Sequence, residues 1–185
     1  CATEANNLAI KDSAWALEEK GNQIVTSSVE HKSVLESCRW LESRGFDLSL
    51  APVDGDGRVD PDTIASAIGE PTFLVSVMYA NSEVGTIQPV TEIGAICKNN
   101  GLRFHVDATQ AAGKIPVNVE QIGCDLLSLS AHKLYGPKGA GALYVRRRRR
   151  LAPLLSGGGQ ERGLRSGTHN VPAIVGFGTA CRLAR

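Results

Sequence analysis

FLVSVMYA, residues 73–80, is a continuous apolar run that decides the fold class. Such runs are typical of a β-strand buried on both faces, which is the situation of a central strand in a parallel sheet. Further strand-like runs occur before it in the sequence at NQIVTSS (22–28) and after it at LRFHV (102–106) and DLLSLS (125–130). Helical patterns separate these runs, and the alternation predicts an α/β fold with a mostly parallel sheet sandwiched by helices.

Caps, glycines and apolar spacing mark the other expected elements. Thr3 can cap the first helix, and Gly45 can end the second. We expect helices over 4–20, 33–43, 62–68, 88–100 and from 171 onward, and further strands over 46–53 and 141–147. The segment that follows 102–106, as far as Gly123, looks irregular. No repeat or linker divides the chain before about residue 151, so one domain is expected.

Composition and charge narrow the functional classes. With 20 Lys plus Arg against 19 Asp plus Glu, net charge selects neither nucleic acid nor a membrane surface as a partner. No apolar run approaches the roughly 18–20 residues of a membrane helix, and nothing at the start resembles a signal peptide, so we expect the cytoplasm or an organelle matrix. The 5 cysteines show neither disulfide-framework nor CxxC metal spacing, which predicts reduced thiols and no metal site.

An arginine run at residues 146–150 is the strongest local charge feature. A nucleic-acid patch and a solvated surface turn both fit such a run. Because it follows a predicted strand and stands alone in a neutral chain, we favour the solvated turn.

Polar residues follow the carboxyl ends of three predicted strands. In open α/β sheets, ligands bind just beyond those ends, so residues placed there are candidates for a site. The candidates are His31 after 22–28, Asp107 and Gln110 after 102–106, and Ser130, His132 and Lys133 after 125–130. If those strands are neighbours, an acid, an amide, two imidazoles and an amine converge on one crevice.

This set of groups matches what pyridoxal phosphate requires. Lys133 can supply the amine for a Schiff base, and Asp107 the anion beside the pyridine nitrogen. The hydroxyls of Thr3 and Ser130 and the imidazole of His132 can bond the phosphate, together with amides at a helix N-terminus. Each residue has an ordinary alternative, since Lys133 can be a solvated surface residue and Asp107 a helix N-cap. The joint placement favours the cofactor site.

Sequence blocks in a fixed order carry a family resemblance over nearly the whole chain. The blocks are ATEANNLAIK (2–11), TSSVEHKSVLESC (26–38), VSVMYANSEVGTIQPV (75–90), FHVDATQAAGK (104–114), DLLSLSAHKLYGPKGAGALYV (125–145) and GGGQERGLRSGTHNVPAIVGFG (157–178). They resemble the cysteine desulfurases of the class V aminotransferase group, on the fold-type I pyridoxal phosphate scaffold. The resemblance implies a seven-stranded type of sheet. It also implies that residues 1–185 are a partial large domain, without the family's N-terminal segment and C-terminal small domain.

The resemblance assigns roles around the cofactor ring. By it, Lys133 is the Schiff-base lysine, Asp107 pairs with the pyridine nitrogen and Gln110 bonds the phenolic oxygen. His31 would stack on the ring and is the acid/base candidate, because an imidazole exchanges protons near neutral pH. Where the family has a second asparagine after Asn81, this chain has Ser82, so that residue's ring contact is not carried over.

The resemblance also assigns the phosphate site and the oligomeric state. Ala2, Thr3, Ser130 and His132 match the family's phosphate-binding positions. Thr168 matches a residue that reaches the phosphate of the neighbouring subunit, which implies a homodimer with composite sites.

The implied reaction is conversion of L-cysteine to L-alanine, with sulfur passed as a persulfide to an acceptor or iron–sulfur scaffold protein. A selenocysteine lyase or another class V enzyme is the enzymatic alternative, and a truncated cofactor-binding or dimerisation module is the non-catalytic one. The family's catalytic cysteine lies beyond the RSGT block, so residues 1–185 alone are expected to be inactive. Cys38, Cys97 and Cys124 fall on apolar stripes or beside a strand and are expected in the core.

Overall fold

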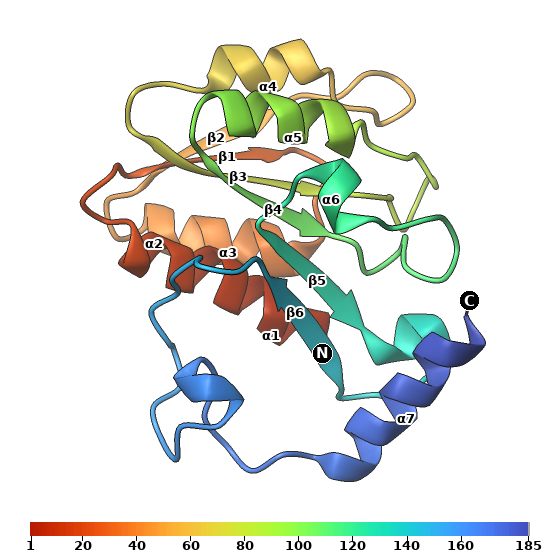
Figure 1. Ribbon diagram of the computed structural model, residues 1–185. Helices are drawn as coiled ribbons and strands as arrows, with labels where there is room; N and C mark the ends of the chain where they lie inside the picture. Colours follow the sequence, from red (N-terminus) through yellow and green to blue (C-terminus); the bar gives the residue numbers. More distant parts are fainter. Residues whose placement is uncertain (185) are drawn as a thin grey trace.

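A six-stranded sheet in the order β2-β1-β3-β4-β5-β6 forms the middle layer of the computed structural model, which describes residues 1–184 (Figure 1). Its strands are β1 (Gln23–Ser27), β2 (Asp47–Ala51), β3 (Thr72–Met78), β4 (Arg103–Asp107), β5 (Leu126–Ser130) and β6 (Gly141–Val145). Neighbouring strands are parallel except for the antiparallel pair of β5 and β6. The expected α/β fold is confirmed, with six strands in the described residues where a seven-stranded type was expected.

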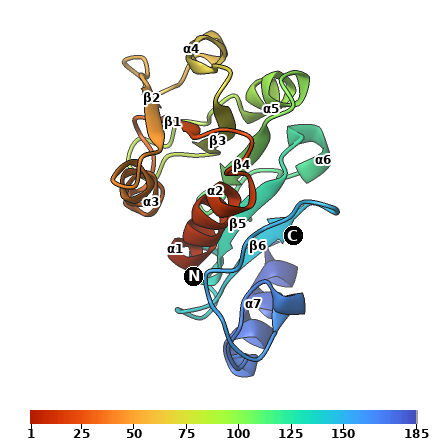
Figure 2. The ribbon, with the colours of Figure 1, turned by 90° about the vertical axis from the view of Figure 1, so that its left-hand side faces the viewer.

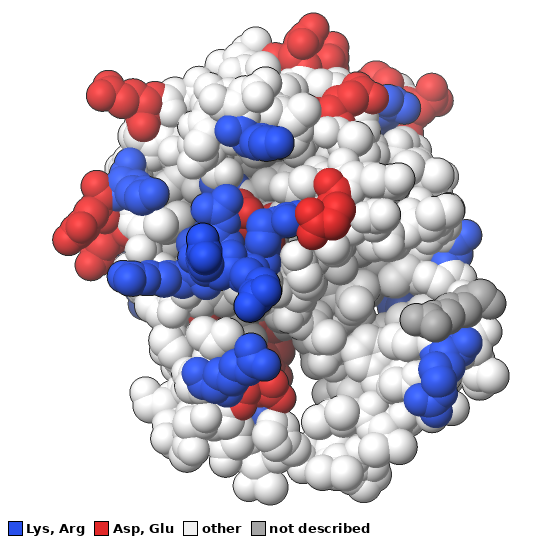
Figure 3. Space-filling view, in the orientation of Figure 1, with Lys and Arg blue, Asp and Glu red and all other residues white. Residues whose placement is uncertain are grey.

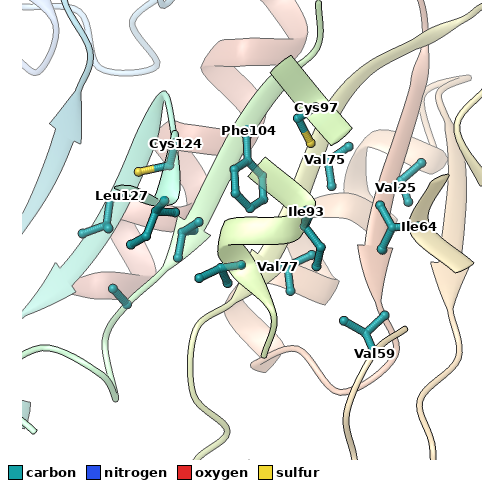
Figure 4. Close-up of a cluster of buried hydrophobic side chains, with 14 of the residues drawn as sticks. Val25, Val59, Ile64, Val75, Val77, Ile93, Cys97, Phe104, Cys124 and Leu127 are labelled. Carbon is teal, nitrogen blue, oxygen red and sulfur yellow. The ribbon is translucent and has the colours of Figure 1, made fainter. Parts of the chain in front are cut away.

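One face of the sheet is covered by α4 (Pro61–Ala67), α5 (Val90–Asn99) and the short α6 (Val119–Ile122). Their apolar residues pack on the buried side chains of the central strands, as Ile93 of α5 and Phe104 of β4 do in Figure 4. β3 is buried at every position, as its continuous apolar run predicts.

The opposite face carries two helical segments that pack together. The first is a continuous helical stretch of α1 (Ala2–Asn7), the π-helix η1 (Leu8–Asp12) and α2 (Ser13–Ala16), and the second is α3 (Lys32–Glu42). Trp15 and Trp40 meet edge to face across them, with ring centroids 6.0 Å apart. Figure 2 shows these two segments on one side of the sheet and α4 to α6 on the other.

A third, smaller core lies beside the β5–β6 end of the sheet. There α7 (Val171–Leu183) packs on the 3-10 turn η2 (Ala131–Leu134) through Phe177 (Figure 1). A side chain at Gly136 would come within 3.1 Å of Ala180, so glycine allows this close approach. η3 (Glu161–Gly163) lies in the loop that leads into α7.

The predicted helices and strands all occur, with ends shifted by a few residues. Four features were not expected: the short 3-10 turns η2 and η3, the helix α6, which Asn118 caps in the segment that looked irregular, and the π-helix within the first helix. Among residues 1–184, no helix combines the length and the apolar character that crossing a bilayer demands.

Candidate active site

The candidate residues come together because parallel strands bring their carboxyl ends to one edge of the sheet. β4 ends at Asp107, and its neighbour β5 ends at Ser130, directly before the turn that carries Lys133. β1 is two strands away from β4, with β3 between them, and the chain after β1 leads to His31 at the start of α3. The sequence left open whether these strands are neighbours. β4 and β5, which lead to Asp107 and Lys133, are neighbours, whereas β1, which leads to His31, is next to neither of them.

Lys133 is directed by the packing of its own turn. In a 3-10 turn, residues three apart lie on the same side, and here Ala131 and Leu134 are both buried in the core with α7. This arrangement leaves His132 exposed and Lys133 half-buried on the other sides of the turn. Within residues 1–184, the Lys133 Nζ atom forms no hydrogen bond or ion pair, so its amine is available to a ligand.

Asp107 is only 5% exposed and is held through both carboxyl oxygens. Oδ2 accepts a 2.8 Å hydrogen bond from Nδ2 of Asn6 on α1, and Oδ1 accepts a 3.0 Å bond from the backbone N–H of Thr109. The second contact is the hydrogen bond expected if Asp107 serves as a helix N-cap. Because an ionised carboxylate offers about four lone pairs, acceptor capacity remains for a ligand.

Asn6 and Ser33 connect Asp107 to His31, and sequence reasoning missed both. Asn6 is fully buried, and its Nδ2 also donates to Ser33 Oγ at 2.8 Å. Ser33 Oγ lies 2.8 Å from Nδ1 of His31, which caps α3. A signal was available, because Asn6 lies on the same helical face as the buried Ala2 and Ala5, and a polar residue on an apolar stripe needs a partner.

The phosphate candidates meet beside the start of α1. Ser130 Oγ lies 2.9 Å from His132 Nδ1, so these two side chains are adjacent. Ser130 pairs with Gly141 of β6, and a side chain at Gly141 would come within 2.7 Å of the Cys1 backbone. Glycine therefore lets the beginning of α1, with Ala2 buried and the Thr3 side chain exposed, rest against the strand that pairs with Ser130.

Thr168 lies in the exposed loop between η3 and α7. Arg165 of the same loop forms an ion pair with Glu4 of α1, with Nε 2.5 Å from Oε1, so this loop is fastened to the helix that carries Thr3. The role of Thr168 toward a neighbouring subunit stays a prediction.

Gln110 and Ser82 are each engaged by a residue nearby in the chain. Gln110 Oε1 accepts a 3.0 Å hydrogen bond from Lys114 Nζ, so a contact between this oxygen and a cofactor requires the lysine to move. The Gln110 amide nitrogen can donate to a ring oxygen without displacing it. Ser82 is exposed and lies next to Glu83, which agrees with leaving it out of the site.

Two buried titratable residues flank the candidate site. Glu30 precedes His31, and its Oε1 accepts hydrogen bonds from Ser27 Oγ at 2.6 Å and from the Met78 backbone N–H at 2.8 Å. Its Oε2 is buried without a partner in the described residues, and burial raises the pKa of this carboxyl to about 8. His105 lies two residues before Asp107, and burial lowers the pKa of its imidazole to about 4, so it is neutral.

Three of the cysteines are in the core, as expected. Cys38, Cys97 and Cys124 are buried, and burial raises the pKa of their thiols to about 12, 12 and 11 respectively. A thiol must ionise to act as a nucleophile, so these three do not serve as sulfur acceptors in this fold. Cys1 is half-buried and Cys181 is exposed.

The arginine run lies at the opposite edge of the sheet. β6 is antiparallel, so its last residue, Val145, pairs with Leu126 at the start of β5. Arg146 forms an ion pair with Glu120 at 2.9 Å, whereas Arg147 and Arg148 line an open cavity of about 560 Å³ together with Arg162. Basic side chains gather on this face in Figure 3.

The model of one protein family, aminotransferase class V, matches residues 1–185, the entire chain. The chain belongs to the class V aminotransferase family. Among relatives in this family, it is 53% identical over 182 residues to cysteine desulfurase IscS of Dictyoglomus turgidum, covering 98% of this chain and 46% of the relative. It is 54% identical over 185 residues to the mitochondrial cysteine desulfurase of Arabidopsis thaliana, covering 99% of this chain and 41% of that protein.

A solved structure of a NifS-like protein shares the fold of this class V chain with a TM-score of 0.96. The two are 48% identical, and the match covers all of this chain and 51% of the other. The chain therefore spans about half the length of the curated relatives and solved structures that it matches.

Proposed function

We propose that residues 1–185 form the cofactor-binding part of a cysteine desulfurase that uses pyridoxal phosphate. The observation that carries the proposal is the placement of a buried carboxylate, Asp107, and a free amine, Lys133, at and just beyond the carboxyl ends of two adjacent parallel strands. The similarity to proteins named cysteine desulfurase supports it, because it extends over 98% of the chain.

The residues present fit this cofactor. Lys133 would hold the aldehyde carbon, and Asp107 keeps lone pairs with which it would pair with the pyridine nitrogen. Thr109 Oγ1 is buried without a partner in the described part of the chain, so a hydrogen-bonding group is missing at this place. The adjacent hydroxyl and imidazole of Ser130 and His132 are suited to a phosphate.

Pyridoxal phosphate supplies an electron sink for negative charge that develops on the substrate's α carbon. The negative charge of Asp107 favours the protonated pyridine nitrogen, by attraction between opposite charges. Lys133 would hold the cofactor through its amine, and the same amine, when released, would serve to accept a proton from the substrate. Asp107 and Lys133 would thus perform separate tasks: Asp107 stabilises positive charge on the ring nitrogen, and Lys133 transfers a proton.

The proposed net reaction joins L-cysteine and a protein thiol to give L-alanine and a protein persulfide. The substrate's C–S bond breaks, a new S–S bond forms, and the β carbon takes up a proton. Cys38, Cys97 and Cys124 are not suited to accept the sulfur, because they are buried and their thiols are protonated. As the family resemblance implies, we propose that the accepting thiolate comes from outside residues 1–185. A sulfur-acceptor protein and a homodimer complete the proposal.

The relatives are bacterial, archaeal and mitochondrial proteins, which supports a location in the cytoplasm or an organelle matrix. The test of function uses the complete protein that contains this chain, loaded with pyridoxal phosphate and a thiol reductant. We expect L-alanine and sulfide in equal amounts from L-cysteine. Alanine formation from L-selenocysteine alone would instead identify a selenocysteine lyase, and no product from either substrate would refute the proposal.

A further inference from the structure

A chain of hydrogen bonds runs from His31 through Ser33 and Asn6 to Asp107. It joins three elements, because His31 and Ser33 begin α3, Asn6 is on α1 and Asp107 ends β4. Each of the three side-chain contacts in the chain measures 2.8 Å. Asn6, Ser33 and Asp107 are all buried, with 0%, 8% and 5% of their surfaces exposed. Such contacts are strong because little water competes for them.

The direction of the donors in this chain is fixed. The Asp107 carboxylate can only accept when ionised, so the Asn6 amide must turn its nitrogen toward it. The same nitrogen uses its second hydrogen on Ser33 Oγ. The Asn6 oxygen is then left buried without a partner in the described residues, a cost that the two donated bonds offset.

Ser33 in turn determines which ring nitrogen of neutral His31 carries the hydrogen. The backbone N–H of Ser33 can only donate, and it points at His31 Nδ1 from 3.1 Å, so this ring nitrogen is an acceptor. The Ser33 hydroxyl accepts from Asn6 and directs its own hydrogen to the same nitrogen. A neutral His31 must therefore carry its hydrogen on Nε2, the nitrogen that Ser33 leaves free.

We propose that Asn6 is a positioning residue that sets Asp107 and, through Ser33, His31 in the geometry the cofactor needs. The inference rests on the proposed function, and it narrows the role of His31. With its hydrogen on Nε2 and its Nδ1 occupied by Ser33, neutral His31 can act at Nε2 only as a donor, which leaves proton abstraction to Lys133. A single buried amide thus positions Asp107 directly and His31 through Ser33.

The first test measures binding of pyridoxal phosphate to the complete protein after removal of its cofactor. Asn6→Ala removes the donor to Asp107, and we expect the affinity to fall about tenfold or more, as loss of a hydrogen bond to a charged group does. The matched control is Asn7→Ala, since the neighbouring amide of Asn7 bonds the Thr3 carbonyl and, among the described residues, neither Asp107 nor Ser33. Equal affinities of the two variants would overturn the inference and leave the proposed function intact. Failure of the wild-type protein to bind the cofactor would overturn both.

The second test needs no cofactor and no change at Asn6. In the ¹⁵N-labelled complete protein, we expect the proton of neutral His31 on Nε2, and the Asn6 side-chain amide to be protected from exchange with solvent. Ser33→Ala should shift the resonances of both His31 Nδ1 and Asn6 Nδ2, which lie on different helices. A proton on Nδ1, or an Asn6 resonance unchanged by Ser33→Ala, would overturn the inference.

Discussion

Glu30 Oε1 accepts a hydrogen bond from the backbone N–H of Met78, which ties the turn after β1 to the last residue of β3. The contact holds His31 in position, because His31 follows Glu30 directly in the chain. It also holds a carboxyl where burial raises its pKa from 4.5 to about 8. In the folded protein this group is therefore protonated at neutral pH.

Replacing Glu30 by glutamine should change how stability depends on pH. Between about pH 4.5 and 8 the folded state holds a proton that the unfolded state releases, so stability falls as pH rises, by on the order of 1 kcal/mol per pH unit. Glu30→Gln stays neutral, so its free energy of unfolding should match wild type at pH 5 and exceed it by a few kcal/mol at pH 9. Urea unfolding at both pH values measures this. The exposed Glu70→Gln serves as control, and parallel pH profiles of Glu30→Gln and wild type would contradict the assignment.

Gly94 should tolerate no side chain despite its place inside helix α5. A methyl group there would come within 1.9 Å of the Ile122 carbonyl oxygen, which forces α5 and α6 apart. We expect Gly94→Ala to destabilise by about 1–3 kcal/mol, as overpacking does. Gly178→Ala, in α7 with open space around it, should instead stabilise by up to about 1 kcal/mol. Thermal unfolding of both variants distinguishes them, and equal melting temperatures would argue against the close contact.

Substitution of Lys133 should remove the covalent attachment of the cofactor. Lys133→Ala of the complete protein, given pyridoxal phosphate, should lack the visible absorbance of a lysine Schiff base. Lys138→Ala, an exposed lysine five positions later, should keep that absorbance in full. A visible band in Lys133→Ala that borohydride abolishes while the cofactor stays covalently attached would place the attachment on another lysine.

Asparagine at Asp107 should impair chemistry more than cofactor content. The neutral side chain keeps the size of aspartate but no longer favours a protonated pyridine nitrogen, so we expect kcat to fall about a hundredfold or more. The cofactor bound at saturating pyridoxal phosphate, measured by its absorbance, should change by less than about twofold. Asp125→Asn is the matched control, because Asp125 is equally buried but bonds Arg149 at the other edge of the sheet. A similar kcat for both variants would refute the role of Asp107.

The sequence predicts the parts of the site that depend on strand ends. LRFHV and DLLSLS are recognisable strands, and because both are parallel, the residues that follow them, Asp107 and Lys133, had to share an edge. The side-chain partners were not predictable in this way. Asn6 reaches Asp107 across 101 positions, and only the packing of α1 on the sheet brings them together.

Local geometry limits the prediction elsewhere. α6 has only four residues, too few for apolar spacing to be visible, and its cap at Asn118 resembles an ordinary turn. The π-helix has no distinctive composition, since LAIKD suits a regular α-helix equally well. Both features are fixed by contacts with the rest of the fold.

The π-helix η1 changes the rotation of α2 about the helix axis relative to α1. One extra residue in a turn rotates everything beyond it by about 100° relative to a regular helix. α1 can therefore turn Asn6 toward the end of β4 while α2 turns Ala14 into the core with Trp15 and Trp40. Deletion of one residue from Leu8–Asp12 would restore a regular helix. Only one of Asn6 and Ala14 could then keep its direction, and the other would rotate away from its partners. The π-helical turn thus lets one continuous helix direct Asn6 toward the site and Ala14 toward the core.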